Sequence, residues 1–354
     1  LFFLRTMLLY SQRYIKELID MTEKFYLGTY TKRVSKGIYS VQLDTEKKQF
    51  SNLTLEAEIE NPTYLALNAD HSLLAAVSKE ETGGITVFNT TQAETLTKVS
   101  HYHDTTAVPC YIAFNKESNH LLAANYHEGH VSSYKFDAAV TLVDRVIHPS
   151  LEENQPHVHY TDYTPDEKWI VVCDLGSDIV ATYQQDGEKL QRVSTYNSRK
   201  GAGPRHLAFH PTLPIAYLIC ELNASIEVLS YDTETGSFTF IEQHLLTTAE
   251  QQAWGGAIHL TKNGKFLYAS NRGYDRIYVF QVKEETGLLT FVADYDTFGS
   301  IPRDFHLSKD ERFIIIGHQE SDNLTLYERD SETGILTLCQ KDFFAPEVVC
   351  VIPF

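Results

Sequence analysis

The sequence predicts an all-β fold, a seven-bladed β-propeller in which each blade has four antiparallel strands. The first observation behind this prediction is a motif that occurs seven times, at intervals of 47, 47, 48, 51, 47 and 44 residues. The second is that short apolar stretches alternate with turn residues between successive copies, which is typical of strands and hairpins. Four-stranded units of this length are the repeats of a β-propeller.

The recurring motif opens the first strand of each unit. It consists of a proline, a variable residue and an apolar stretch. It reads PTYLAL from Pro62, PCYIAF from Pro109, PHVHYT from Pro156, PRHLAF from Pro204, PRDFHL from Pro302 and PEVVCV from Pro346, and GGAIHL from Gly255 takes the remaining place without a proline.

Three further strands are expected after the motif in each unit. The second strand is continuously apolar, as in LLAAVS and WIVVCD, and the third alternates, as in GITVFN and RIYVFQV. Several units then contain D-x-E-T-G or E-E-T-G. The glycine suits a hairpin position with φ above zero. A fourth strand, such as LLTFVADYD, completes the unit.

The last blade is expected to be shared between the two ends of the chain. Pro346 begins the final strand, EVVCVIPF, while KFYLGTY and GIYSVQL near the start supply the second and third strands. Sharing a blade closes the ring and leaves no open edge. We therefore expect residues 21–354 to form a single propeller domain. Residues 1–20 are interpreted as a leader or N-terminal extension, with an amphipathic helix as the alternative.

Composition narrows the choice of partners. The formal net charge is −17, which argues against nucleic acid or an anionic membrane as a partner. The five cysteines are scattered and form no C-x-x-C pair. An odd number of scattered cysteines is typical of reduced thiols and predicts a cytoplasmic protein.

The repeat brings distant polar residues to one mouth of the central channel. The first strand of each unit should be innermost, so the residue after each anchor lies at that mouth, and the second strand should end there too. The anchor positions hold Thr63, Cys110, His157, Arg205, Gly256, Arg303 and Glu347, and the second strands end at Asn125, Asp174, Glu221, Asn271, Arg272 and His318. Two further histidines, His159 and His206, lie close by in sequence.

The arginines in this group indicate an anion-binding site. Arg205, Arg272 and Arg303 repel one another, and in a protein with a net charge of −17 their proximity favours a role in binding phosphate or carboxylate. The alternative is that each arginine pairs with a nearby carboxylate and holds the blades together. The candidate carboxylates are Asp174, Glu221, Asp304 and Glu347.

Other chemistries find little support in the sequence. It contains neither the glycine patterns of nucleotide-binding loops nor the G-x-S-x-G elbow, so no cofactor is expected. His101 and His103 in HYHD suit a metal, but no partner cluster is recognisable and we interpret them as surface histidines. His157 and His159 share a strand face without a third ligand, so a metal-free site is predicted.

With these motifs in place, the sequence resembles the seven-bladed β-propeller lactonase family from about Phe25 to Phe354. The matching stretches are YLGTYT, QPHVHY, GPRHLAFHP, ICELNASI, ASNRGYDRIYVF, IPRDFHLS and DSETGIL. The resemblance implies a catalytic group of His157, Arg205, Glu221 and Arg272, carried by QPHVH, GPRH, CELN and NRG. The chain departs from the common bacterial pattern at Tyr274, where histidine is frequent.

The resemblance also implies hydrolysis of a small anionic sugar lactone, with 6-phosphogluconolactone of the pentose phosphate pathway as the expected substrate. Glu221 or His157 would act as base, Arg205 and Arg272 would face the oxyanion or a substrate carboxylate, and Arg303 would face the phosphate. The remaining expected substrate-binding residues are His159, His206, Asn271 and His318. Two alternatives stay open, namely a muconate-type lactonising cycloisomerase and a non-catalytic propeller that binds a protein partner.

Overall fold

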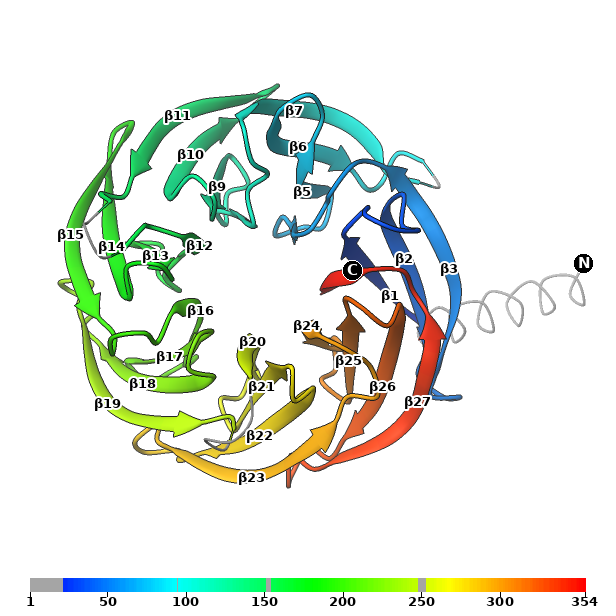
Figure 1. Ribbon diagram of the computed structural model, residues 1–354. Helices are drawn as coiled ribbons and strands as arrows, with labels where there is room; N and C mark the ends of the chain where they lie inside the picture. The colour runs from blue at the N-terminus through cyan, green and yellow to red at the C-terminus, as the bar shows by residue number, and fades with distance from the viewer. Residues whose placement is uncertain (1–21, 94, 151–153, 248–252) are drawn as a thin grey trace, which may run out of the picture.

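The computed structural model describes residues 22–354 except residues 94, 151–153 and 248–252. The described residues form seven separate four-stranded antiparallel sheets, arranged as blades around a central axis (Figure 1). They contain no helix, and so none that is long and apolar enough to cross a membrane. The predicted fold class is confirmed. The predicted leader, residues 1–20, lies outside the described residues.

The two inner strands of each blade surround the channel. The innermost strands are β28 (Val348–Pro353), β4 (Leu65–Leu67), β8 (Tyr111–Phe114), β12 (Val158–Tyr163), β16 (Pro204–Phe209), β20 (Trp254–Leu260) and β24 (Pro302–Leu307). The second strands are β1 (Thr22–Thr29), β5 (Leu73–Lys79), β9 (His120–Asn125), β13 (Ile170–Asp174), β17 (Ile215–Cys220), β21 (Phe266–Arg272) and β25 (Phe313–His318).

The two outer strands form the rim of the ring (Figure 1). The third strands are β2 (Gly37–Asp44), β6 (Gly83–Asn89), β10 (His130–Phe136), β14 (Ile179–Asp186), β18 (Ser225–Tyr231), β22 (Arg276–Val282) and β26 (Asn323–Arg329). The outermost are β3 (Gln49–Glu58), β7 (Thr97–Thr105), β11 (Val140–Ile147), β15 (Lys189–Asn197), β19 (Phe238–Leu245), β23 (Leu289–Asp296) and β27 (Leu336–Phe344).

Both ends of the described chain meet in one blade, as predicted. The final strand β28 pairs antiparallel with β1, with Phe25 opposite Pro353 and Gly28 opposite Cys350. β2 and β3 complete this sheet on the outside. The ring is therefore closed by backbone hydrogen bonds between segments more than 300 residues apart.

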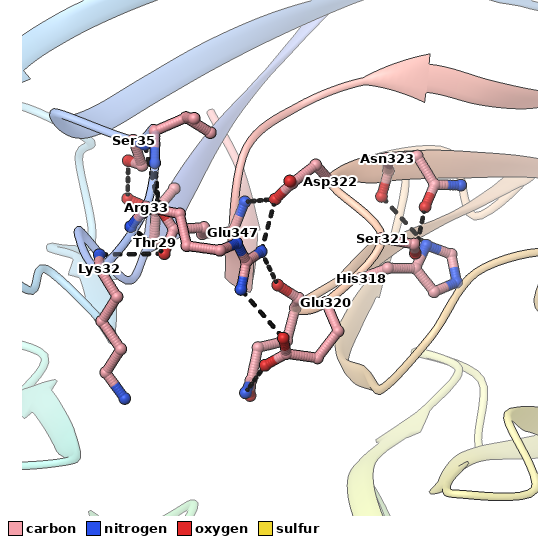
Figure 2. A network of polar contacts seen from close by, with 12 residues as sticks. Thr29, Lys32, Arg33, Ser35, His318, Glu320, Ser321, Asp322, Asn323 and Glu347 are labelled. Carbon is pink, nitrogen blue, oxygen red and sulfur yellow. Dashed lines mark hydrogen bonds and ion pairs between the residues drawn. The ribbon is translucent and has the colours of Figure 1, made fainter.

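A buried carboxylate reinforces this closure (Figure 2). Glu347 precedes β28, and its two carboxylate oxygens accept hydrogen bonds of 2.9–3.1 Å from the backbone amides of residues 32–35, between β1 and β2. The Arg33 guanidinium binds Glu320 at 2.9 Å and Asp322 at 2.8 Å in the neighbouring blade. The loop after β1 is thereby tied both to the residue that precedes the innermost strand of its own blade and to the neighbouring blade of β24–β27.

The hydrophobic core lies between adjacent blades. All residues of β25, sequence FIIIGH, are buried, whereas in the outermost strand β27 only the first residue, Leu336, is buried. Phe313 and Ile315 of β25 pack in one cluster with Phe25 and Val41 of the neighbouring blade. Full burial of each such side chain contributes about 1.5–3 kcal/mol. The second strands therefore read as continuous apolar runs because both faces of each blade are covered.

The D-x-E-T-G turns join neighbouring blades as well as neighbouring strands. Gly287 and Gly334 have φ of 70° and 72°, as the motif predicted. The Gly334 carbonyl accepts a 3.0 Å hydrogen bond from the Tyr268 hydroxyl of the preceding blade, and the Gly287 carbonyl accepts one of 2.8 Å from Tyr217. The turns thus repeat the same hydroxyl-to-carbonyl contact from blade to blade.

Candidate active site

A cavity of about 430 Å³ lies where innermost strands begin and second strands end. Its polar and aromatic lining includes Tyr30, Lys32, Thr63, Lys79, Cys110, Tyr126, His127, His159, Glu221 and Arg303. A smaller cavity of about 30 Å³ shares several of these residues and adds Arg205, His206 and Asp304. The two cavities together occupy the channel mouth that the sequence repeat predicted.

Two arginines converge on one glutamate at this mouth. Arg205 Nε lies 3.1 Å and Arg272 Nη2 lies 2.7 Å from the same oxygen, Oε2 of Glu221. Arg205 also donates to the Gly256 carbonyl at 2.6 Å, and Arg272 Nη2 donates to the Gly255 carbonyl at the same distance. The carbonyl contacts fix both guanidinium groups in place around the carboxylate.

The arginines keep Glu221 ionised despite its burial. Burial raises the pKa of the carboxyl, but Arg272, Arg205 and Arg303 lower it by more, so the net pKa lies below the usual value. The same surroundings lower the pKa of an arginine. Burial, Arg272 and Arg303 lower the pKa of Arg205 to about 9. All these groups therefore remain charged near neutral pH.

Arg303 lines both cavities and differs from the other two arginines. We find no hydrogen bond or ion pair of its guanidinium within the described part of the chain. Its guanidinium carbon lies 6.0 Å from the centroid of the Tyr30 ring. Burial lowers the pKa of Arg303, but Tyr30, Glu221 and Cys110 raise it by more. Arg303 is thus a charged group that remains available to a ligand.

Two buried histidines form one wall of the site. His159 and His206 stack obliquely with ring centroids 5.2 Å apart, and His206 also contacts the rings of Tyr64 and Tyr111. Burial, followed by nearby Arg205, lowers the pKa of both histidines well below the usual value. Both are therefore neutral, and the Nδ1 atom of His159 is buried with no hydrogen-bond partner among the described residues.

His157 lies at the same mouth but is not among the residues that line either cavity. Its ring stacks on Tyr126, with centroids 4.3 Å apart, and its Nδ1 bonds the Tyr126 carbonyl at 2.9 Å. Since a carbonyl can only accept, Nδ1 is the donor in this hydrogen bond. His157 therefore supports Tyr126, which does line the cavity.

Asn271 and His318 lie outside the lining of both cavities. Asn271 is buried and donates to the Leu246 carbonyl at 2.5 Å. His318 is also buried, and its Nδ1 bonds the Asn323 carbonyl at 3.0 Å, away from the Glu347 network (Figure 2). The sequence repeat placed these residues at the correct end of their strands, but Asn271 binds a carbonyl just after β19 of the preceding blade, and His318 binds one at the start of β26 in its own blade.

Sequence reasoning missed several lining residues. Tyr30 follows β1, Lys79 ends β5 and Tyr126 follows β9, so all three occupy the position at the end of a second strand that also holds Glu221. The 47-residue repeat would have found them if it had been read in every blade. Lys32 lies further along a loop and carries no comparable signal.

Among the described residues, no cluster of metal-ligating side chains lies inside either cavity. The geometry instead provides fixed cations, an ionised carboxylate and neutral imidazoles around a small polar cavity. Such an arrangement can bind an anionic ligand, stabilise developing negative charge and accept a proton from water.

The fold and the cavity define a class, a seven-bladed propeller with an arginine-lined cavity at a mouth of its channel. Residues 24–353 match the family described as "Lactonase, 7-bladed beta-propeller". The chain therefore belongs to the seven-bladed β-propeller lactonase family.

Individual proteins are similar to this chain over most of its length. A protein of Lactococcus lactis subsp. cremoris is 45% identical, covering 94% of this chain and all of its own length. The 6-phosphogluconolactonase of Bacillus subtilis is 37% identical, covering 79% of this chain and 83% of its own. The structure of a periplasmic gluconolactonase of Pseudomonas aeruginosa is 26% identical, with a TM-score of 0.88, covering 94% of this chain and 99% of that one.

Proposed function

We propose that this protein hydrolyses 6-phosphogluconolactone to 6-phosphogluconate, a step of the pentose phosphate pathway. The observation that carries the proposal is the group of three arginines around Glu221, of which Arg303 has no carboxylate partner among the described residues. A 37% identical relative named 6-phosphogluconolactonase supports the choice of lactone. Five cysteines without a disulfide support a cytoplasmic location.

Glu221 is the base that we assign in the hydrolysis. It lines the cavity, and Arg205 and Arg272 both contact its Oε2 atom, whereas Oε1 forms no ion pair in the described part of the chain. Glu221 accepts a proton as the water oxygen bonds to the lactone carbonyl carbon. The bond between that carbon and the ring oxygen then breaks, and the ring oxygen receives the proton. Water is added across the ester, and the products are an acid and an alcohol.

The arginines act on the charge that builds up during this reaction. The carbonyl oxygen becomes negative when water adds, and Arg205 and Arg272 supply fixed positive charge at this mouth. Preorganised donors of this kind stabilise the transition state without having to reorient. We assign His159 and His206, which are neutral, to contacts with the uncharged sugar hydroxyls.

The phosphate is assigned to Arg303. Lys32 and Lys79 line the same cavity and add positive charge near it. The Lys32 ammonium lies 4.0 Å from the centroid of the Tyr30 ring, beside the ring that also faces Arg303. A group of separate cations suits a phosphate better than it suits an uncharged lactone.

The test is a hydrolysis assay with purified protein and freshly generated 6-phosphogluconolactone, run beside gluconolactone and carboxy-muconate. We expect the highest kcat/KM with the phosphorylated lactone. A preference for gluconolactone would retain lactone hydrolysis but remove the phosphate assignment. Turnover of carboxy-muconate alone would indicate the cycloisomerase. No turnover of any of the three would favour a non-catalytic propeller.

A further inference from the structure

A cluster of two histidines and a glutamate lies on the second blade, outside both cavities. Glu80 follows β5, and His101 and His103 lie two residues apart on the outermost strand β7, so both point to the same face. The potential ligand atoms of the three side chains all lie within 4.8 Å of one another. The proposed lactone reaction does not use these three side chains. The sequence motif HYHD contains the two histidines but does not explain why Glu80 lies beside them.

His103 is the residue of the cluster whose ring is already oriented for metal binding. The His103 side chain is only 6% exposed, and its Nε2 bonds the Ser78 hydroxyl at 2.8 Å. The buried Nδ1 has no hydrogen-bond partner in the described chain and lies 3.8 Å from Oε2 of Glu80. When Nε2 carries the proton and donates it to Ser78, Nδ1 presents its lone pair toward Glu80. Such an outer hydrogen bond is what orients metal-binding histidines in proteins.

The backbone opposite His103 leaves room for this ring. Gly84 pairs with His103 across the β6–β7 ladder. A Cβ atom at Gly84 would lie 2.6 Å from Cδ2 of the His103 ring, too close for any side chain there. The lack of a side chain at Gly84 therefore leaves space for the His103 ring, whose Nδ1 lies 3.8 Å from Glu80.

We propose that Glu80, His101 and His103 form a binding site for a divalent transition-metal ion, with Zn²⁺ as the ion that two imidazoles and one carboxylate suit best. Ligand atoms about 2.1 Å from a tetrahedral zinc lie roughly 3.5 Å apart, so the cluster must contract by about 1 Å. Glu80 and His101 are exposed and can rotate to do so. Three protein ligands leave the fourth position to water.

A cation already occupies part of this site. The Lys98 ammonium bonds Oε1 of Glu80 at 2.5 Å, so a metal ion must compete with it for the carboxylate. Such competition is expected only if the cluster binds a metal ion, and not if its side chains merely stabilise the blade. Replacing Lys98 with an uncharged residue should strengthen metal binding.

The experiment is a calorimetric titration of tag-free, EDTA-treated protein with Zn²⁺. We expect a single saturable site per chain and a rise in melting temperature with Zn²⁺ concentration. His101→Ala, at an exposed position, and His103→Ala should each weaken binding roughly tenfold or more, because even outer-shell changes cost 10–100-fold. Lys98→Met should bind Zn²⁺ more tightly than wild type.

The matched control is His244→Ala. His244 also lies beside a carboxylate on an outermost strand, 3.1 Å from Glu242, but among the described residues this pair belongs to no cluster of three potential metal ligands. This variant should keep the wild-type affinity. The proposal is overturned if wild-type protein shows no saturable Zn²⁺ binding, or if His101→Ala binds as tightly as wild type. Equal or weaker binding by Lys98→Met would remove Glu80 as a ligand.

Discussion

Glu221 and its arginines join neighbouring blades and also belong to the site that we propose for catalysis. Arg205 and Arg272 each pair with Glu221 and with a backbone carbonyl at the start of β20, so they do hold blades together. Three cations nevertheless surround one carboxylate at this mouth, and the local charge remains positive. The blade-bracing alternative thus accounts for the geometry of two arginines but not for Arg303.

The first prediction concerns these two arginines. If Arg205 and Arg272 stabilise developing negative charge, Arg205→Ala or Arg272→Ala should lower kcat for the lactone by roughly 10²–10³-fold. Circular dichroism would establish that each variant is folded. Arg276→Ala is the control, because Arg276 pairs with Asp294 at 2.7 Å on the rim strands and lines neither cavity. Activity within threefold of wild type in both site variants would contradict the assignment.

A second prediction separates the phosphate from the reacting carbonyl. A contact with the phosphate is present in both the bound substrate and the transition state, so its loss should raise KM more than it lowers kcat. Arg303→Ala should raise KM for the phosphorylated lactone about 10- to 150-fold, the value of a charge-assisted hydrogen bond. The effect on gluconolactone should be much smaller. An equal loss on both substrates would mean that Arg303 only supports the blade.

His318 leads to a prediction about acid stability. Burial lowers the pKa of His318 to about 4, against about 6.5 in an unfolded chain. Between these values the unfolded chain binds a proton that the folded chain does not, so stability should fall as pH falls from 6.5 to 4. Urea unfolding at pH 7 and pH 5 should show a smaller loss for His318→Asn than for wild type. An identical pH dependence would show that His318 is not a source of the acid sensitivity.

At the scale of the element, the D-x-E-T-G turn shows what sequence can and cannot predict. The motif predicted a glycine with positive φ, and Gly334 has φ of 72°. It did not predict that this glycine packs against the preceding blade, because that contact depends on the spacing between sheets. A Cβ at Gly334 would lie 2.5 Å from Cδ1 of Phe266.

The turn glycines provide a matched comparison. Gly187 occupies the corresponding turn between β14 and β15, with φ of 58°, and a Cβ added there would meet no atom within 4 Å. Gly187→Ala should therefore destabilise the protein only by the left-handed backbone cost, about 1–2 kcal/mol. Gly334→Ala should cost clearly more, because Phe266 must also move. Equal losses in urea unfolding would contradict a packing role for Gly334.

For the candidate site too, the sequence predicted the location of residues but not their detailed contacts. The repeat period brought Arg205, Glu221, Arg272 and Arg303 to one mouth, and the structure places them there. The period fixes the end of a strand but not the direction of its side chains. His318 consequently shares the strand position of the site residues while its ring bonds a backbone carbonyl.

At the scale of the whole molecule, the ring depends on contacts between its two ends. No covalent bond joins β28 to β1, and Glu347 is a buried charge beside this junction. Burial raises the pKa of Glu347, but the backbone amides of residues 32–35 lower it by more, so the net pKa lies below the usual value. The carboxylate is therefore charged, and the amides are the groups that stabilise it.

This arrangement predicts that one uncharged substitution weakens the whole ring. Glu347→Gln keeps the shape of the side chain but replaces one acceptor oxygen with a donor that faces amide N–H groups. Hydrogen bonds to a charged group are worth about 1.5–3 kcal/mol, and we expect a loss of at least that size in urea unfolding. Because each blade packs on the next around a closed ring, the loss should appear as an earlier single transition.

Glu347→Gln should also weaken substrate binding at the proposed active site. The loop held by Glu347 carries Lys32, which lines the larger cavity. KM for the phosphorylated lactone should therefore rise while the protein is still fully folded at low temperature. Glu332→Gln, at an exposed position of the turn between β26 and β27, is the control and should change neither quantity. Wild-type stability in Glu347→Gln would show that the β1–β28 pairing closes the ring without help from the buried carboxylate.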